Sequence, residues 1–216
     1  MKPLMIYRDQ FEVELKLNEL GVNREELLEV VKKVVAARNN AVAFDPLSTK
    51  GQFGFIYGTR AIREALCPKG WVVDRKDNVE STFNPSLGVK IIYQNADSAA
   101  NSEREPQSIS GKGAASTKLV ENSFSGYLFP EMEEEERLKR EAQIKSLNAT
   151  VWFLFVSVEG EEVCAELSCP RSIEDGQFKG FHERIFFLQN NEWDESVVIE
   201  DTESPLDEFE VNVSRK

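Results

Sequence analysis

The first candidate for chemistry is a carboxylate inside an apolar hairpin, VWFLFVSVEGEEVCAELSCP at residues 151–170. The runs 151–158 and 162–168 are predicted to be two strands joined by a glycine turn. Both faces of the first strand are apolar, as expected of a central strand that is covered on both sides. Glu166 lies in the middle of the second strand and Glu162 beside the turn. The sequence leaves open whether Glu166 is a catalytic group or an ordinary polar residue on a half-exposed strand.

A helix predicted at 130–147 precedes this hairpin, and the combination resembles the PD-(D/E)xK nuclease superfamily in outline. The resemblance implies metal-dependent cleavage in which Glu166 would help to hold Mg²⁺. The chain departs from the family's pattern in two places. Its tripeptide at Glu166 reads E-L-S, so the lysine of the motif is missing. The first strand lacks an internal aspartate, and Glu159 and Glu162 flank the turn instead.

The other residues with reactive side chains are one histidine and a pair of cysteines. His182 could act as a general base with Glu183 beside it, because imidazole titrates near neutral pH. Alternatively, His182 is an ordinary polar residue at the edge of a strand. Cys164 and Cys169 have no second pair of ligands that would complete a zinc site, so they are expected to be core thiols. No metal site is predicted outside the nuclease hypothesis.

Two further patterns could indicate ligand binding. The run GQFGFIYG, residues 51–58, has three glycines without the spacing of a dinucleotide-binding loop, and its alternating aromatic residues favour a strand at 53–57. A modest group of basic residues is interleaved with acidic ones, so direct contact with nucleic acid is not expected. The group comprises Arg60, Arg63, Lys69, Arg75 and Lys76.

The helices and strands that the sequence predicts indicate an α+β fold, with a mostly antiparallel sheet and two or three packed helices. Residues 23–40 predict a helix, with Asn23 as N-cap and Glu26 three residues later. Residues 11–20 show alternating apolar side chains, which favour a strand. The remaining expected elements are strands at 71–74, 88–95 and 184–188 and a short helix at 59–66.

We expect residues 1–216 to form a single domain. Three polar segments lie outside the expected apolar helices and strands. Residues 97–117 contain almost nothing to bury and predict a long, flexible polar loop. Residues 192–216 hold many acids and only two bases, which indicates an acidic C-terminal tail. The helix at 130–147 has little apolar surface, so we expect it to be solvated or to lie against a partner.

Composition narrows the class of protein. The chain has 216 residues, 41% of them hydrophobic, which suffices for one sizeable core. Its formal net charge of −12 repels bare nucleic acid and favours an acidic, solvated surface. An odd number of cysteines fits a reducing cytoplasm. Neither a signal peptide nor a membrane span is expected.

These observations favour a non-enzymatic protein-binding or regulatory subunit of a cytoplasmic complex. Its contacts are expected from the acidic helix, the polar loop or the acidic tail. The alternatives are a metal-dependent nuclease, or a subunit of one, using Glu166, Glu162 and His182, and an acidic inhibitor that mimics DNA. No cofactor is expected, except Mg²⁺ under the nuclease alternative. The candidate binding residues are Glu133, Glu135, Glu136, Asp207 and Glu208.

Overall fold

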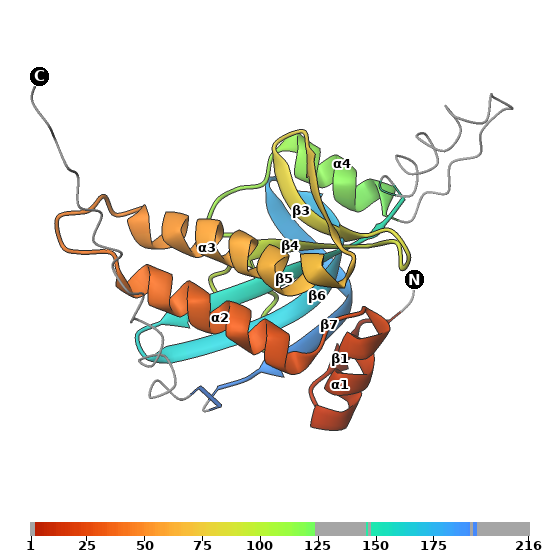
Figure 1. Cartoon of the computed structure of the whole chain (residues 1–216), viewed down its shortest axis with the longest axis horizontal. Coiled ribbons are helices and arrows are strands. Elements are labelled where there is room, and N and C mark those ends of the chain that lie inside the picture. The colour runs from red at the N-terminus through yellow and green to blue at the C-terminus, as the bar shows by residue number, and fades with distance from the viewer. Residues whose placement is uncertain (1–2, 124–145, 147, 191, 194–216) are drawn as a thin grey trace, which may run out of the picture.

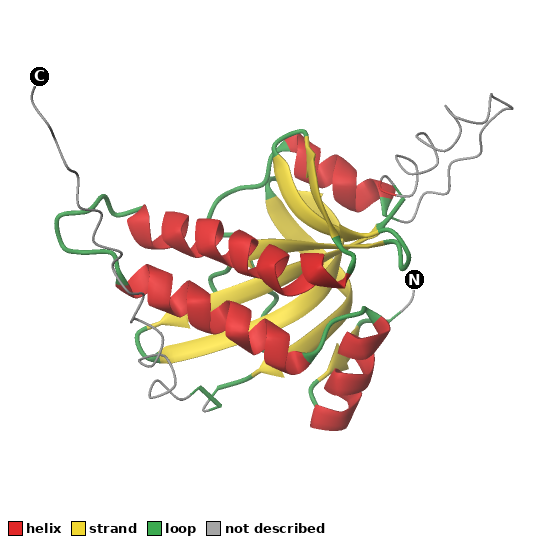
Figure 2. Cartoon of the chain, viewed as in Figure 1, coloured by secondary structure: helices red, strands yellow, loops and turns green. Residues whose placement is uncertain are grey.

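A computed structural model describes residues 3–123, 146, 148–190 and 192–193, and this part of the chain forms an α+β fold (Figures 1 and 2). One seven-stranded sheet has the order β1-β7-β6-β5-β4-β3-β2. The pairs β1–β7 and β4–β5 are parallel, and the other neighbouring pairs are antiparallel. The predicted fold class is therefore confirmed. The strands are β1 (Met5–Tyr7), β2 (Val72–Lys76), β3 (Val79–Asn84), β4 (Val89–Asn95), β5 (Thr150–Glu159), β6 (Glu162–Glu174) and β7 (Gln177–Leu188).

Four α-helices accompany the sheet within the described residues: α1 (Gln10–Glu19), α2 (Arg24–Asn39), α3 (Thr49–Leu66) and α4 (Ala114–Asn122). A short 3₁₀ turn, η1 (Cys67–Lys69), follows α3. None of these helices is long and apolar enough to cross a bilayer. The predicted helix at 130–147 lies outside the described residues apart from Ser146, and the acidic tail lies outside them apart from residues 192 and 193.

The sheet has two buried faces. The first face carries Trp152 and Leu154 of β5 and packs against α1, α2 and α3, and the larger core cluster combines residues of these helices with residues of β4 to β7. Figure 1 shows α2 and α3 lying side by side across this face. The second face carries Phe153 and Phe155 and packs against Val120 of α4. The prediction that β5 is a central strand covered on both sides is therefore confirmed.

Helix α2 forms as its sequence predicts. The Asn23 side chain accepts a hydrogen bond from the Glu26 backbone N–H at 2.9 Å, and Glu26 accepts one from the Asn23 N–H at 3.2 Å. This reciprocal pair satisfies two backbone donors that the first helical turn leaves open.

The strand expected at 11–20 was wrong, because these residues form α1. Asp9 caps the helix by accepting hydrogen bonds from the N–H groups of Phe11 and Glu12. Val13 and Leu17 are buried at helical spacing, whereas Phe11 stays 73% exposed. A favourable cap and one buried i, i+4 pair outweigh the alternation of apolar residues.

The strand expected at 53–57 was also wrong, and the helix expected at 59–66 is only the second half of α3. Gly54 and Gly58 explain the difference, because they let α3 lie directly on β4. A Cβ atom at Gly58 would lie 2.4 Å from the Tyr93 ring, and one at Gly54 would lie 2.6 Å from the Asn95 Oδ1 atom. The alternation of aromatic residues therefore does not mark one face of a strand.

The strands expected at 71–74, 88–95 and 184–188 correspond to β2, β4 and the end of β7. Strand β3 lies between two of these expected strands and was not predicted. Asp77 and Asn78 both have positive φ, which makes the tight turn between β2 and β3. Helix α4 was missed too, and it begins within the segment expected to be a loop at 97–117.

Candidate functional site

Glu166 is a fully buried structural anchor on the second face of the sheet. Arg184 of β7 donates from Nε to Glu166 Oε1 at 2.9 Å and from Nη2 to Oε2 at 2.7 Å. Ser168 Oγ donates to Oε1 at 2.7 Å. Glu166 is 0% exposed and Arg184 is 1% exposed. Both carboxylate oxygens are therefore occupied by neighbouring donors, and Glu166 does not occupy the half-exposed strand position that the sequence left open as one alternative.

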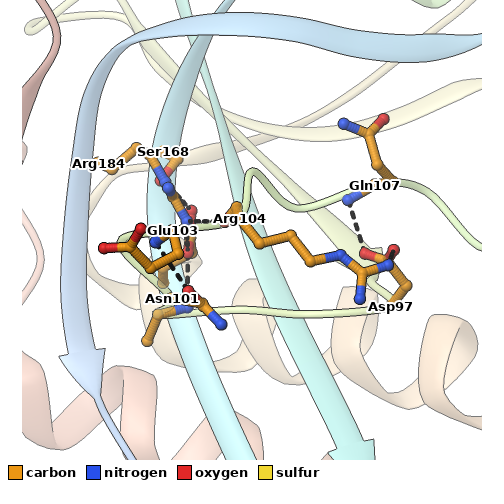
Figure 3. A network of polar contacts seen from close by, with 9 residues as sticks. Asp97, Asn101, Glu103, Arg104, Gln107, Ser168 and Arg184 are labelled. Carbon is orange, nitrogen blue, oxygen red and sulfur yellow. Dashed lines mark hydrogen bonds and ion pairs between the residues drawn. The ribbon is translucent and has the colours of Figure 1, made fainter.

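The same ion pair fixes the segment that we name the covering loop, residues 97–113 (Figure 3). The N–H of Ala100 donates to Glu166 Oε2 at 2.6 Å, and Arg184 Nη2 donates to the Arg104 carbonyl at 3.3 Å. Asp97 pairs with Arg104 and accepts from the N–H of Gln107 at 2.8 Å. The covering loop is thus attached to the sheet through polar groups, although its side chains offer little to a core.

The far end of the covering loop is attached to the β6–β7 hairpin. The N–H of Ser108 donates to Gln177 Oε1 at 3.1 Å, and Gln177 Nε2 donates back to the Ser108 carbonyl at 3.2 Å. Lys112 N–H donates to the Gly176 carbonyl at 2.8 Å. These contacts place residues 109–112 beside the end of β4.

The structure does not bring the three candidate catalytic residues together. Glu166 lies on the second face, whereas His182 of β7 lines a cavity on the first face. Glu162 is exposed and lies opposite Glu159 at the β5–β6 turn. No group of three or more His, Cys, Asp or Glu residues that could hold a metal ion occurs among the described residues. The nuclease and DNA-mimic interpretations stay untested predictions.

The candidate binding residues of the sequence lie outside the described part of the chain. They are Glu133, Glu135, Glu136, Asp207 and Glu208.

A groove of about 760 Å³ lies at the carboxyl end of β4, and we name it the β4 groove. Four segments line it: the end of α2, the loop and first turns that begin α3, the end of β4, and residues 109–112 of the covering loop. Its lining residues are Arg38, Leu47, Ser48, Lys50, Gly51, Gln52, Phe55, Ile56, Gln94, Asn95, Ile109, Ser110, Gly111 and Lys112.

Asn95 holds two of these segments together. Its Nδ2 donates to the Gly51 carbonyl at 2.8 Å, and its Oδ1 accepts from the Tyr93 hydroxyl at 2.9 Å and from Arg38 Nη1 at 3.4 Å. The close approach of α3 to β4, which its glycines permit, places the helix start beside the strand end. The shape of the β4 groove therefore depends on tertiary packing between segments distant in sequence.

The charged residues of the β4 groove are all cationic. Arg38, Lys50 and Lys112 line it, and no Asp or Glu does, although the whole chain carries a formal charge of −12. Burial lowers the pKa of Lys112 to about 8. The Lys112 ammonium donates to Gln94 Oε1 and lies 5.8 Å from the centre of the Phe153 ring. An anionic group entering the groove would compensate the desolvation of Lys112.

Apolar side chains lie exposed around these cations. Leu47 is fully exposed at 105% relative area, and Ile109 is 63% exposed. Phe55 and Ile56 of α3 are 42% and 47% exposed. Phe44, in the loop that joins α2 to α3, is 100% exposed but does not line the groove. The site can therefore take a ligand that carries both carboxylates and apolar groups.

The sequence analysis missed this groove because its residues come from two regions, 38–56 and 94–112. One local signal was present. The turn around Asp45 and Pro46 carries Phe44 and Leu47, two large apolar residues in a segment that has no periodic pattern to bury them.

Comparisons with known proteins give this chain no relative. No protein-family model matches it, and neither a curated protein nor a solved structure does. Its function must therefore be inferred from the geometry of the site.

Proposed function

We propose that this protein is a non-enzymatic binding subunit that docks an acidic, partly apolar segment of another protein in the β4 groove. The observation that carries the proposal is the exposure of Leu47, at 105% relative area, and of Ile109, at 63%, in a groove lined by three cationic side chains. Folded proteins commonly expose single apolar residues, but several large ones around one concavity are typical of an interaction site.

Charge complementarity supports an acidic partner segment. Arg38, Lys50 and Lys112 would attract carboxylates, and the acid-free lining offers no repulsion at close range. The contact would bury Leu47 and Ile109 against apolar residues of the partner. The electrostatic part of this binding weakens as salt increases, whereas the apolar part does not.

We place the proposed complex in the cytoplasm. Cys67, Cys164 and Cys169 are free thiols, which supports a reducing compartment. The acidic helix and tail remain proposed as additional contact segments through Glu133, Glu135, Glu136, Asp207 and Glu208.

Site-specific photo-crosslinking in the native cells tests the proposal. Leu47→p-benzoylphenylalanine places the crosslinker at the groove, and Phe11→p-benzoylphenylalanine places it on α1, where Phe11 is 73% exposed. Both changes replace an exposed apolar residue by a larger one, so neither should disturb folding. We expect a discrete crosslinked protein from position 47 that position 11 does not give.

The captured protein is then identified, and its crosslinked peptide must be acidic and contain apolar residues. A second change, Lys112→Glu, should abolish the product from position 47, and binding of the purified partner should weaken in high salt. The proposal fails if position 47 yields no product, if position 11 yields the same product, or if the crosslinked peptide is basic.

A further inference from the structure

A second cavity, of about 720 Å³, lies on the first face of the sheet at the opposite end of β4 from the groove. We name it the α1 cavity, because α1 forms one wall, and residues of β1, β4, β5, β6 and β7 form the others. Its lining residues are Pro3, Met5, Tyr7, Lys16, Glu19, Leu20, Val89, Thr150, Trp152, Cys169, His182 and Glu183. It shares no lining residue with the β4 groove.

The floor of the α1 cavity is apolar and aromatic. Cys169 of β6 lies opposite Glu183 of β7, which in turn lies beside Met5 of β1. Trp152 and Val89, on β5 and β4, extend the floor and are almost fully buried. This floor could hold an aromatic or branched apolar group.

Charged residues form one edge. Lys16 Nζ lies 2.9 Å from Glu19 Oε2 and 3.2 Å from Glu183 Oε2. The same ammonium lies 5.2 Å from the centre of the Tyr7 ring. Burial alone would lower the pKa of Lys16, but hydrogen bonds to Glu19 and Glu183 outweigh it and raise this pKa. Lys16 therefore stays positively charged between two carboxylates.

Among the described residues at this edge, two carboxylates face one ammonium, so the carboxylates are in excess. Burial and the charge of Glu183 both raise the pKa of Tyr7, so its phenol stays uncharged. An incoming cation would donate a charge-assisted hydrogen bond to a carboxylate, whereas an anion would meet repulsion.

We propose that the α1 cavity binds a small organic cation, a primary amine that carries an aromatic or branched apolar body. The ammonium lies against Glu183 and Glu19, and the apolar body lies on Trp152 and Leu20. This site is independent of the protein-binding groove.

Nuclear magnetic resonance of the full chain, with ¹⁵N-labelled tryptophan, tests this assignment. The probes are 2-phenylethylamine, 2-phenylethanol and phenylacetate, which share one ring and differ in charge. A pH of about 8 keeps the amine protonated and phenylacetate ionised, so the three probes differ in charge. The Trp152 indole signal is assigned from its loss in Trp152→Phe.

The amine should shift the Trp152 signal in a saturable way, the alcohol should act more weakly, and phenylacetate should have no effect. Glu183→Gln should weaken binding of the amine about tenfold, because it removes one charge-assisted hydrogen bond. Glu19→Gln, at a carboxylate that is 55% exposed, gives the same test without changing a strand residue. The matched control is Glu14→Gln, which lies on α1 and does not line the cavity.

Three outcomes would overturn the proposal. They are a Trp152 signal that the amine does not shift, equal shifts with all three probes, and amine binding that neither Glu183→Gln nor Glu19→Gln weakens. If Glu183→Gln does not fold, the Glu19→Gln result alone decides.

Discussion

Arg184 of β7 binds Glu166 of the neighbouring strand β6 along a diagonal. The residue directly opposite Arg184 on β6 is Ser168. The two side chains meet through two hydrogen bonds, at 2.9 and 2.7 Å, in a region closed to solvent. The same two side chains also bind backbone groups of the covering loop at Ala100 and Arg104. One ion pair thus connects the sheet interior to the segment that forms a wall of the β4 groove.

Removing one member of this pair should destabilise the protein strongly. Glu166→Gln leaves the Arg184 charge buried without its partner, and we expect the free energy of unfolding to fall by about 3 kcal/mol. The double change Glu166→Leu/Arg184→Leu should cost less than the sum of the single changes, because it leaves no unpaired charge. Urea unfolding measures both.

A surface pair provides the control for this comparison. Lys33 and Glu64 lie 2.7 Å apart with both side chains about half exposed, so Glu64→Gln should cost less than about 1 kcal/mol. Equal losses for Glu64→Gln and Glu166→Gln would contradict the structural role of Glu166. A gain in stability on adding Mg²⁺ that disappears in Glu166→Gln would instead support the nuclease hypothesis.

The approach of α3 to β4 predicts opposite effects for two alanine substitutions. A Cβ at Gly58 would lie 2.4 to 2.6 Å from atoms of the buried Tyr93 ring, so Gly58→Ala should cost about 1–3 kcal/mol. Gly51→Ala meets nothing within 4 Å and lies in the same helix, so it should raise stability by about 0.5–1 kcal/mol. Thermal unfolding compares the two, and a neutral Gly58→Ala would show that α3 is not held close to β4.

Two elements were predicted correctly from local sequence signals. The Asn23 and Glu26 cap identified α2, and the apolar run of β5 identified a strand buried on both faces. Helix α3 was misjudged because the reason for its glycines is a contact with Tyr93, which lies 35 residues beyond Gly58 in the chain. Glycines in a helix can allow another element to pack closely, but the sequence alone does not show which residue packs against them.

The sequence predicted less of the candidate site than of the fold. Glu166 was singled out as a candidate catalytic carboxylate, but its partner Arg184 was noticed only as the start of a strand. The covering loop looked as if it had nothing to bury, and it is in fact attached by backbone hydrogen bonds that composition does not show. The β4 groove combines residues from separate segments, so no local motif could describe it.

Cysteine reactivity provides a test of burial that is independent of the proposed functions. Cys67 is partly exposed, whereas Cys164 and Cys169 are buried, and burial raises the pKa of Cys164 to about 11 and that of Cys169 to about 12. Because the thiolate is the reactive form, a disulfide reagent at neutral pH should modify Cys67 quickly and the other two slowly. Cys67→Ser should remove the fast phase, and urea should make the remaining thiols react. Three equal rates in the folded protein would contradict this burial pattern.

The final prediction concerns the pH dependence that Lys112 gives to stability. Its folded-state pKa of about 8 lies below the ordinary lysine value of 10.5, so the unfolded chain binds more protons between these two pH values. Stability that depends on Lys112 must therefore rise as pH increases through this window. Relative to Lys112→Met, the wild-type protein should gain about 1–3 kcal/mol in its free energy of unfolding between pH 7 and about 10.5. Lys50→Met, which removes an exposed lysine of the same groove, is the matched control. A difference between wild type and Lys112→Met that stays constant with pH would show that Lys112 is solvated rather than buried in the β4 groove.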